Sequence, residues 1–321
     1  MSIEAIIPPA NTAPVKLAVP AGRSRARRLI PIYLFILPAT AVFLLWTLYP
    51  LGDALLMSFY HWNLAGPSQF IGFNNYERAL QDPVFWQAMR NICLYAIISV
   101  PGQMVFGLGA ALLLDQKIRF RALFRTLFYL PVITSWVVVA VIFLYLYNGQ
   151  LGLIDYLLVN TIHVIPGPVY FLGDVNWALP SIAILDIWKG IGWTMVIFLA
   201  ALQGIPQQLY EAAKVDGAGA FQRLRKITIP LLRPAIAFLV VVLTIGAFNS
   251  FTQIYVMTTS GGPGTAGGPL NSTESVLTFM YLKAFYTVDF GYGAAISYMY
   301  AFFILVISVV QISLLRRRYE Y

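Results

Sequence analysis

Six long apolar stretches constrain the fold of this chain more than any other feature of its sequence. A bilayer has a hydrocarbon core about 30 Å thick, which roughly 20 helical residues can cross. Lipid offers backbone N–H and C=O groups no partners, so each stretch is expected to form one helix. With 59% hydrophobic and 11% charged residues, the composition is that of an all-α polytopic membrane protein. The six predicted spans are residues 31–59, 88–114, 122–147, 177–203, 234–257 and 291–315.

Basic residues predict the orientation of these spans. Most of the 21 Lys and Arg residues fall on one side of an alternating six-span arrangement, and the positive-inside rule makes that side cytoplasmic. Both termini and the loop 204–233 are therefore expected inside, and residues 60–87, 148–176 and 258–290 outside. The net charge of +8 follows from this topology, so no nucleic-acid partner is expected. The basic side holds Lys16, Arg23, Arg25, Arg27, Arg28, Lys117, Arg119, Arg121, Arg125, Lys214, Arg223, Arg225, Lys226, Arg233, Arg316, Arg317 and Arg318.

The chain is expected to form one membrane domain, residues 30–321, preceded by a flexible cytoplasmic tail, residues 1–29. The tail is rich in proline and small residues, and its basic residues come just before the first span. That order is the reverse of a cleaved signal peptide, so the first span is predicted to remain as an anchor. The single cysteine, Cys93, excludes an intrachain disulfide.

Motifs for catalysis and metal binding are missing from the sequence. There is no Walker motif, no G-x-S-x-G and no H-E-x-x-H, and neither His61 nor His163 has a Cys or carboxylate at ligand spacing. The glycine-rich GPGTAG at 262–267 follows a span rather than a strand, which favours a loop over a dinucleotide site. No enzyme activity, metal site or cofactor is expected.

A polar segment, EAAKVDGAGAFQRLRKITIP at 211–230, lies between two of the apolar spans. Pro206 suits the start of a helix, and Gly217 stands where that helix would end with a positive φ. A second short helix is expected from Phe221 to Ile229, where Pro230 limits it. Small residues let another protein approach the backbone closely, so the segment is predicted to be a docking knob on the cytoplasmic surface.

The same segment resembles the EAA signature found in membrane subunits of ATP-binding-cassette importers. Its pattern is E-A-A, three residues, Gly, nine residues and I-x-I-P, with Ile229 where leucine is commoner. YVMTTSGGP, ending at Pro263, and FIGFNNYERALQDPVFW, starting at Phe70, are similar to stretches of the carbohydrate branch, both maltose-type and glycerol-phosphate-type permeases. The resemblance covers about residues 28–318. The EAA signature is carried by Glu211, Ala212, Ala213, Gly217, Ile227, Ile229 and Pro230.

The resemblance implies a type I importer permease fold and the import of a sugar or oligosaccharide by alternating access. Its implied partners are two copies of a cytoplasmic ATPase, a second related permease in a heterodimer and an extracytoplasmic sugar-binding protein, in the lipid of a bacterial or archaeal cytoplasmic membrane. Glycerol phosphate import remains an alternative. A secondary transporter is less favoured, because six spans without a visible inverted repeat do not match that class. The residues expected to couple to the ATPase are Glu211, Ala212, Ala213, Asp216, Gly217, Ile227 and Pro230.

Polar residues in the fourth and fifth spans predict the substrate path. Asp186 lies about nine residues from Trp177, and therefore roughly 13 Å deep, near the midplane of the bilayer. In the fifth span Asn249, Ser250 and Gln253 fall on one helical face. The alternative is that Asp186 neutralises a nearby lysine and that the polar face joins helices.

The resemblance adds residues to this path, because sugar contacts in the maltose-type subunit match Asp186, Lys189, Gly190, Trp193, Ala247 and Ser250. The charged residues depart from that pattern in type. Trp193 is expected to stack on the sugar, and polar groups are expected to bind its hydroxyls. The complete predicted path is Asp186, Lys189, Gly190, Trp193, Asn249, Ser250 and Gln253.

Overall fold

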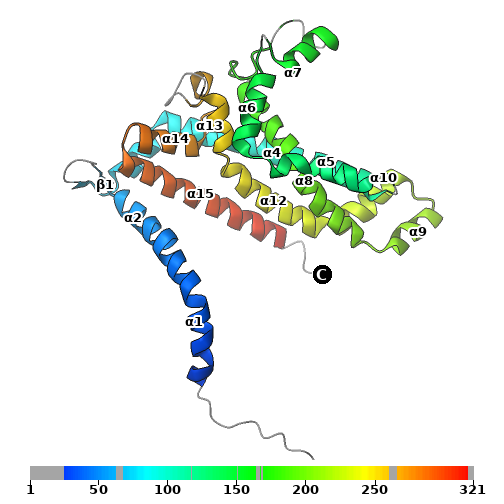
Figure 1. The fold of residues 1–321 in the computed structure, drawn as a ribbon, viewed down its shortest axis with the longest axis horizontal. Coiled ribbons are helices and arrows are strands. Elements are labelled where there is room, and N and C mark those ends of the chain that lie inside the picture. Colours follow the sequence, from blue (N-terminus) through cyan, green and yellow to red (C-terminus); the bar gives the residue numbers. More distant parts are fainter. Residues whose placement is uncertain are drawn as a thin grey trace, which may run out of the picture. The chain divides into compact units, whose positions relative to one another are not determined.

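The computed structural model describes residues 25–62, 68–116, 118–149, 151–163, 167, 169–259 and 266–316. The chain divides into two units, residues 1–53 and 54–321. In the first unit α1 (Arg25–Phe43) continues through the π-helical turn η1 (Leu44–Leu48) into α2 (Tyr49–Met57), which crosses into the second unit (Figure 1). Residues 1–24 of the predicted tail lie outside the described residues, and α1 already begins at Arg25.

The second unit starts with a small antiparallel pair and a short helix. β1 (Tyr60–His61) pairs with β2 (Gln69–Phe70), with Tyr60 opposite Phe70. α3 (Asn74–Gln81) leads into the long helix α4 (Pro83–Asp115). Asp82 caps α4 by accepting a hydrogen bond from the backbone N–H of Val84, 2.9 Å, and Pro83 occupies the first turn. Local capping therefore starts this helix before residue 88, where the predicted span began.

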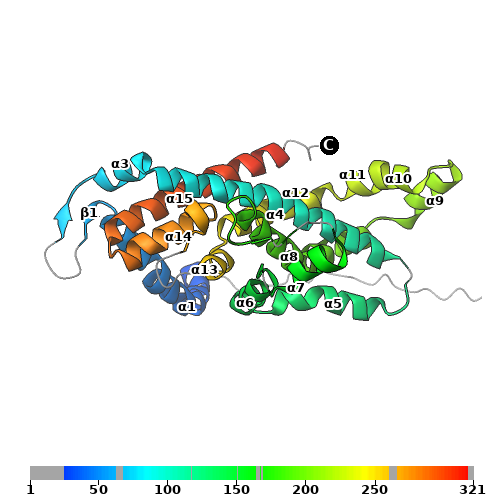
Figure 2. The ribbon, with the colours of Figure 1, turned by 90° about the horizontal axis from the view of Figure 1, so that it is seen from above.

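Helix α8 (Ala178–Gln203) packs along α4 through small residues (Figure 2). The two helices approach where Gly107 faces Thr194 and Gly190 faces Gln103, since a Cβ at either glycine would overlap the facing side chain. The hydroxyl of Thr194 donates to the backbone oxygen of Gln103 across this contact, 3.0 Å. Close packing of this pair forms the centre of the core, where Tyr95, Ile182, Leu185 and Met195 are fully buried.

Two of the predicted spans are not continuous helices. Residues 122–147 form α5 (Arg121–Ile133) and α6 (Trp136–Leu146), which are bent by 96° at the break. Residues 234–257 form α12 (Arg233–Phe248) and α13 (Thr252–Thr258). The expectation of one helix in each of these stretches was therefore wrong. The shorter helix of each broken stretch contacts the other, with α13 packed against α6 (Figures 1 and 2).

Local hydrogen bonds explain where these helices break. At the first break Pro131 lies near the end of α5, and both the N–H and the hydroxyl of Thr134 bond to the Pro131 carbonyl. At the second break the Asn249 amide donates to the carbonyl of Ile245, 2.8 Å. Short polar side chains that bind the preceding turn compete with helix continuation. Hydropathy does not report this competition, so the sequence pattern showed only the apolar character of each stretch.

Several helices in the described residues are long and apolar enough to cross a membrane. By length and composition there are four such helical runs: Pro31–Met57, α4, α8 and Phe290–Leu315. Six are reached if each of two bent pairs is one span, namely α5 with α6, and Ala220–Leu231 with α12, bent by 67°. The other elements are α7 (Leu153–Tyr156), η2 (Leu157–Thr161), α9 (Gln207–Val215), α10 (Ala220–Arg223), η3 (Leu224–Thr228), α11 (Ile229–Leu231), η4 (Pro269–Asn271), α14 (Val276–Tyr281), η5 (Leu282–Tyr286) and α15 (Phe290–Arg316).

We expect Gly107→Ala to destabilise the contact between α4 and α8, whereas Gly109→Ala in the same helix should not. The added methyl group at residue 107 would push Thr194 out of its hydrogen bond, and overpacking of this kind costs about 1–3 kcal/mol. A Cβ at residue 109 meets nothing within 4 Å. The measurement is the thermal unfolding midpoint of the two purified variants in detergent. Equal midpoints for both variants would contradict the packing described here.

Candidate functional site

A cavity of about 310 Å³ lies where the two broken helices meet α4 and α8. Its polar lining comes from α4, α8 and the break between α12 and α13, and its aromatic lining comes from Trp136 and Phe251, one beside each break. The polar lining residues are Gln103, Asp186, Asn249, Ser250, Thr252 and Gln253. The fold therefore gathers hydrogen-bonding groups and aromatic rings from four separate parts of the sequence around one space.

Hydrogen bonds hold several of these groups in place. The Gln103 amide donates to Asp186 Oδ2 at 2.8 Å, which links α4 to α8. The Gln253 amide of α13 donates to the Tyr95 hydroxyl of α4 at 3.2 Å. Ser250 Oγ donates to the carbonyl of Gly246 at 3.3 Å, which satisfies part of the broken turn. These bonds fix the polar lining before any ligand enters.

Lys189 follows Asp186 by one turn on α8 but does not line the cavity. Its ammonium group donates to the carbonyls of Pro131, Val132 and Thr134 at 2.6, 3.1 and 2.9 Å. The side chain is 4% exposed. Among the described residues no ion pair within 4.0 Å joins Lys189 to Asp186. The lysine charge is therefore placed at the end of α5 rather than on the neighbouring carboxylate.

The structure brings together Asp186, Asn249, Ser250 and Gln253 from the predicted path, and leaves the other three members outside the cavity lining. Gly190 packs against Gln103 and so permits the close approach of α4. Trp193 is 40% exposed on α8. Its predicted role stays a prediction.

Sequence reasoning missed Gln103, Trp136, Phe251 and Thr252. Gln103 had a visible signal, because it is an uncharged polar residue near the middle of the span predicted at 88–114. Trp136 had none, since its place beside the cavity depends on a helix break that hydropathy does not reveal. Finding it required the bend between α5 and α6.

The segment predicted as a cytoplasmic knob folds as a short helix, a glycine turn and a second helix, at one end of the second unit (Figure 1). At the end of α9 the N–H of Ala218 bonds to the carbonyl of Ala213, 2.8 Å, and the N–H of Gly217 to that of Lys214, 3.1 Å. This is a Schellman motif, with Asp216 as the C-cap and Gly217 at φ +75°. The predicted positive φ of Gly217 is confirmed.

The second helix of the knob runs further than predicted. It continues as α10, η3 and α11 to Leu231, beyond Pro230, with a widened π-helical turn just before the proline. The Tyr210 hydroxyl lies 2.9 Å from that of Thr228 and ties the two helices together. Ile227 and Pro230 are half-buried in this return, whereas Glu211, Ala212 and Asp216 are exposed.

Two large apolar side chains stand exposed on the knob. Val215 is 88% exposed and Phe221 is 71% exposed, on either side of the glycine turn. Ala212 is also exposed and Ala213 is half-buried, and both follow Glu211 directly in α9. The exposed side chains of the knob are therefore accessible to another protein.

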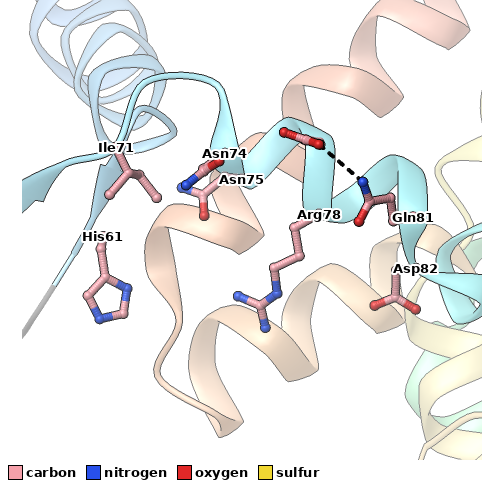
Figure 3. Close-up of a pocket in the computed structure, with 8 residues that line it drawn as sticks. His61, Ile71, Asn74, Asn75, Arg78, Gln81 and Asp82 are labelled. Carbon is pink, nitrogen blue, oxygen red and sulfur yellow. Dashed lines mark hydrogen bonds between the residues drawn. The ribbon is translucent and has the colours of Figure 1, made fainter.

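A second, more open pocket of about 600 Å³ lies between α3 and the β1–β2 pair (Figure 3). The Arg78 guanidinium pairs with Asp289 at 2.6 Å and lies 4.0 Å from the centre of the Tyr292 ring. The Tyr292 hydroxyl donates to Asp82 at 2.9 Å. These contacts fasten α3 to the start of α15, which gives the charged residues at this pocket a structural role.

A chain with several membrane-length apolar helices and a polar cavity at helix breaks has the architecture of a membrane transport subunit. Residues 103–317 match the family described as "Binding-protein-dependent transport system inner membrane component". The chain belongs to this family, and is thus an inner-membrane permease of an ATP-binding-cassette importer rather than an enzyme.

The chain is similar to known permeases over nearly its whole length. It is 36% identical to the probable ABC transporter permease protein YurN of Bacillus subtilis (strain 168), covering 88% of this chain and 95% of that one. It is 35% identical to the lactose transport system permease protein LacF of Rhizobium radiobacter, covering 92% and 98%. A solved bacterial alginate ABC transporter, in complex with an alginate pentasaccharide-bound periplasmic protein, contains a chain that matches with a TM-score of 0.77 and 25% identity, covering 91% and 96%. That match gives this chain the fold of an ABC importer permease.

Proposed function

We propose that this chain is one of two related permeases in an importer for a sugar or oligosaccharide, which it moves by alternating access. The observation that carries the proposal is the polar cavity at the two helix breaks. Irregular backbone at membrane depth is tolerated where it lines a cavity, and transporters bind substrates at such interrupted helices. Carboxylate and amide groups suit sugar hydroxyls, and aromatic rings suit the apolar faces of sugar rings.

The charge of the cavity favours an uncharged sugar over glycerol phosphate. Among the described residues that line it, Asp186 carries a carboxylate and none carries a cationic side chain. Phosphate sites use arginine or lysine, and a carboxylate would repel the ligand. Two of the compared proteins carry carbohydrate names, lactose for one and the acidic polysaccharide alginate for the other, which supports a carbohydrate substrate, and of the two only the lactose name supports an uncharged one.

The proposed partners are a second homologous permease, two copies of a cytoplasmic ATPase and an extracytoplasmic sugar-binding protein. The compared alginate transporter was solved with a periplasmic protein, which supports the last of these. The knob supports the ATPase contact, because docking would bury the exposed side chains of Val215 and Phe221, and burying apolar surface is favourable. Glu211 beside them can meet a basic or polar group of the ATPase.

For the membrane topology we propose six spans, with both termini and the knob in the cytoplasm of a bacterial or archaeal cell. The basic residues near the N-terminus, around Arg121, in the knob and at the C-terminus support this orientation. On this proposal α5 with α6 counts as one span and α12 with α13 as another, while the β1–β2 pair and α3 face outward.

Single cysteines test the topology. In a Cys93→Ser background, Ser68→Cys should react with a membrane-impermeant maleimide added to intact spheroplasts. Gln222→Cys should react only after the membrane is opened. Labelling of the residue 222 site from outside would contradict the proposed orientation.

Gly217→Val should uncouple the ATPase from transport. A positive φ costs an ordinary residue about 1–2 kcal/mol and a β-branched one more, so the turn of the knob should distort. We expect roughly a tenfold loss of ATPase stimulation by the loaded binding protein, the equivalent of about 1.4 kcal/mol. Glu211→Ala should give a milder loss.

The matched control for this variant is Gly219→Ala. Gly219 has φ −66°, and a Cβ there meets nothing within 4 Å, so stimulation should stay near that of the unchanged chain. A Gly217→Val complex that assembles and transports normally would overturn the coupling role.

Gln253→Ala and Asn249→Ala should each slow sugar uptake by several-fold, because each removes one hydrogen-bonding group worth about 1 kcal/mol from the cavity. Trp193→Ala tests in the same assay whether Trp193 is the predicted stacking platform for the sugar. Ser297→Ala is the control, since that hydroxyl bonds within α15 to the Gly293 carbonyl. Unchanged rate and substrate preference in both cavity variants would place the path elsewhere.

A further inference from the structure

The ammonium group of Lys189 donates all three of its hydrogen bonds to backbone carbonyls at the end of α5. An ammonium group has three donors, and the three nearest carbonyls belong to Pro131, Val132 and Thr134. The last carbonyls of a helix have no partner within it, and the same end carries the negative side of the helix dipole. The Pro131 carbonyl also accepts from Thr134, so the lysine matters most to the carbonyls of Val132 and Thr134, which would be costly to leave unpaired.

The helix end in question is the 96° break between α5 and α6. Lipid cannot satisfy carbonyls exposed by a break, so the direction of α6 depends on what binds them. Lys189 binds them from α8, the helix that also carries Asp186. The lysine thereby fixes where α6 begins relative to the cavity.

Trp136 is the first residue of α6, and its ring centre lies 4.7 Å from the Lys189 ammonium. A cation over an indole face is attracted by the ring quadrupole, and more strongly when both are out of water. Trp136 lines the cavity and Lys189 does not, so a ligand there meets the indole rather than the charge. The carboxylate of Asp186 and the amide of Gln103 line the same cavity.

We propose that Trp136 is the aromatic platform on which the apolar face of a sugar ring lies, and that Lys189 is a positioning residue that holds the indole at the cavity by capping α5. This inference rests on the proposed function of carbohydrate import. It assigns the stacking role to a residue outside the seven predicted for the path, and it gives the buried lysine a purpose other than charge neutralisation or substrate contact. The recognised feature is an uncharged pyranose with one apolar face.

The test uses the complete importer, with its ATPase, second permease and binding protein, in proteoliposomes. The probes are radiolabelled lactose, maltose and trehalose, and the readout is sugar accumulated per ATP hydrolysed. Trp136→Ala should lower this ratio about tenfold, and Trp136→Phe should keep it within about threefold, because phenylalanine keeps an aromatic face for the sugar ring to lie on. Trp177→Ala, a tryptophan at the start of α8 that does not line the cavity, is the control and should leave the ratio unchanged.

Lys189→Met should lower the ratio to a similar extent, because the break loses its cap. If the lysine acts through the indole, adding Lys189→Met to Trp136→Ala should cause little further loss. A second readout needs no sugar: in chain labelled with 5-fluorotryptophan, the ¹⁹F resonance that Trp136→Phe removes should shift in Lys189→Met while the resonance of Trp177 stays in place.

Each outcome separates the two proposals. Failure of the unchanged importer to accumulate any of the three sugars would overturn the carbohydrate assignment and this inference with it. Accumulation by the unchanged importer together with a normal ratio in Trp136→Ala would overturn the platform alone. Additive losses in the double variant, or an unmoved Trp136 resonance in Lys189→Met, would overturn the positioning role of the lysine.

Discussion

The structure depends on a single constraint, which is that every backbone N–H and C=O group at membrane depth needs a partner from the protein itself. Continuous helices such as α4 and α8 meet this requirement within each helix. The two broken stretches meet it by other means. Lys189 supplies three donors to the end of α5, while Asn249 and Ser250 bind the last carbonyls of α12. The cavity lies between these two breaks.

The cavity is the consequence of placing both breaks beside the same helix. α13 lies against α6, so residues more than a hundred positions apart in the sequence face one space. α8 contributes Asp186 on one side and the capping Lys189 one turn later, which separates a carboxylate available to the cavity from a cation committed to the backbone. The lone carboxylate among the described lining residues disfavours an anionic ligand, which is consistent with the proposed uncharged sugar.

The knob and the cavity are joined by rigid elements. α8 carries Asp186 and ends at Gln203, just before the knob, while α12 begins at Arg233, just after it, and reaches the cavity at its other end. From Asp186 to Gln203 the helix covers about 25 Å at 1.5 Å per residue. A displacement of the knob therefore acts directly on two walls of the cavity, without any long flexible segment between them. For the proposed ATPase contact at the knob, this connection offers a route to the cavity, since both helices are packed against α4.

The sequence alone determined the features that depend on each residue's own chemistry or on its near neighbours. Hydropathy located the apolar stretches, because transfer of each side chain into lipid is nearly independent of its partners. The turn at Gly217 was also predictable, since helix formers followed by a glycine form a local signal. Four of the cavity residues were visible as polar groups in apolar surroundings. The tertiary structure alone decided that the two breaks meet at one cavity, that Trp136 stands there and that Lys189 caps a helix lying 55 to 58 residues earlier in the chain. These outcomes depend on which carbonyl a distant donor can reach, and no pattern along the sequence encodes that distance.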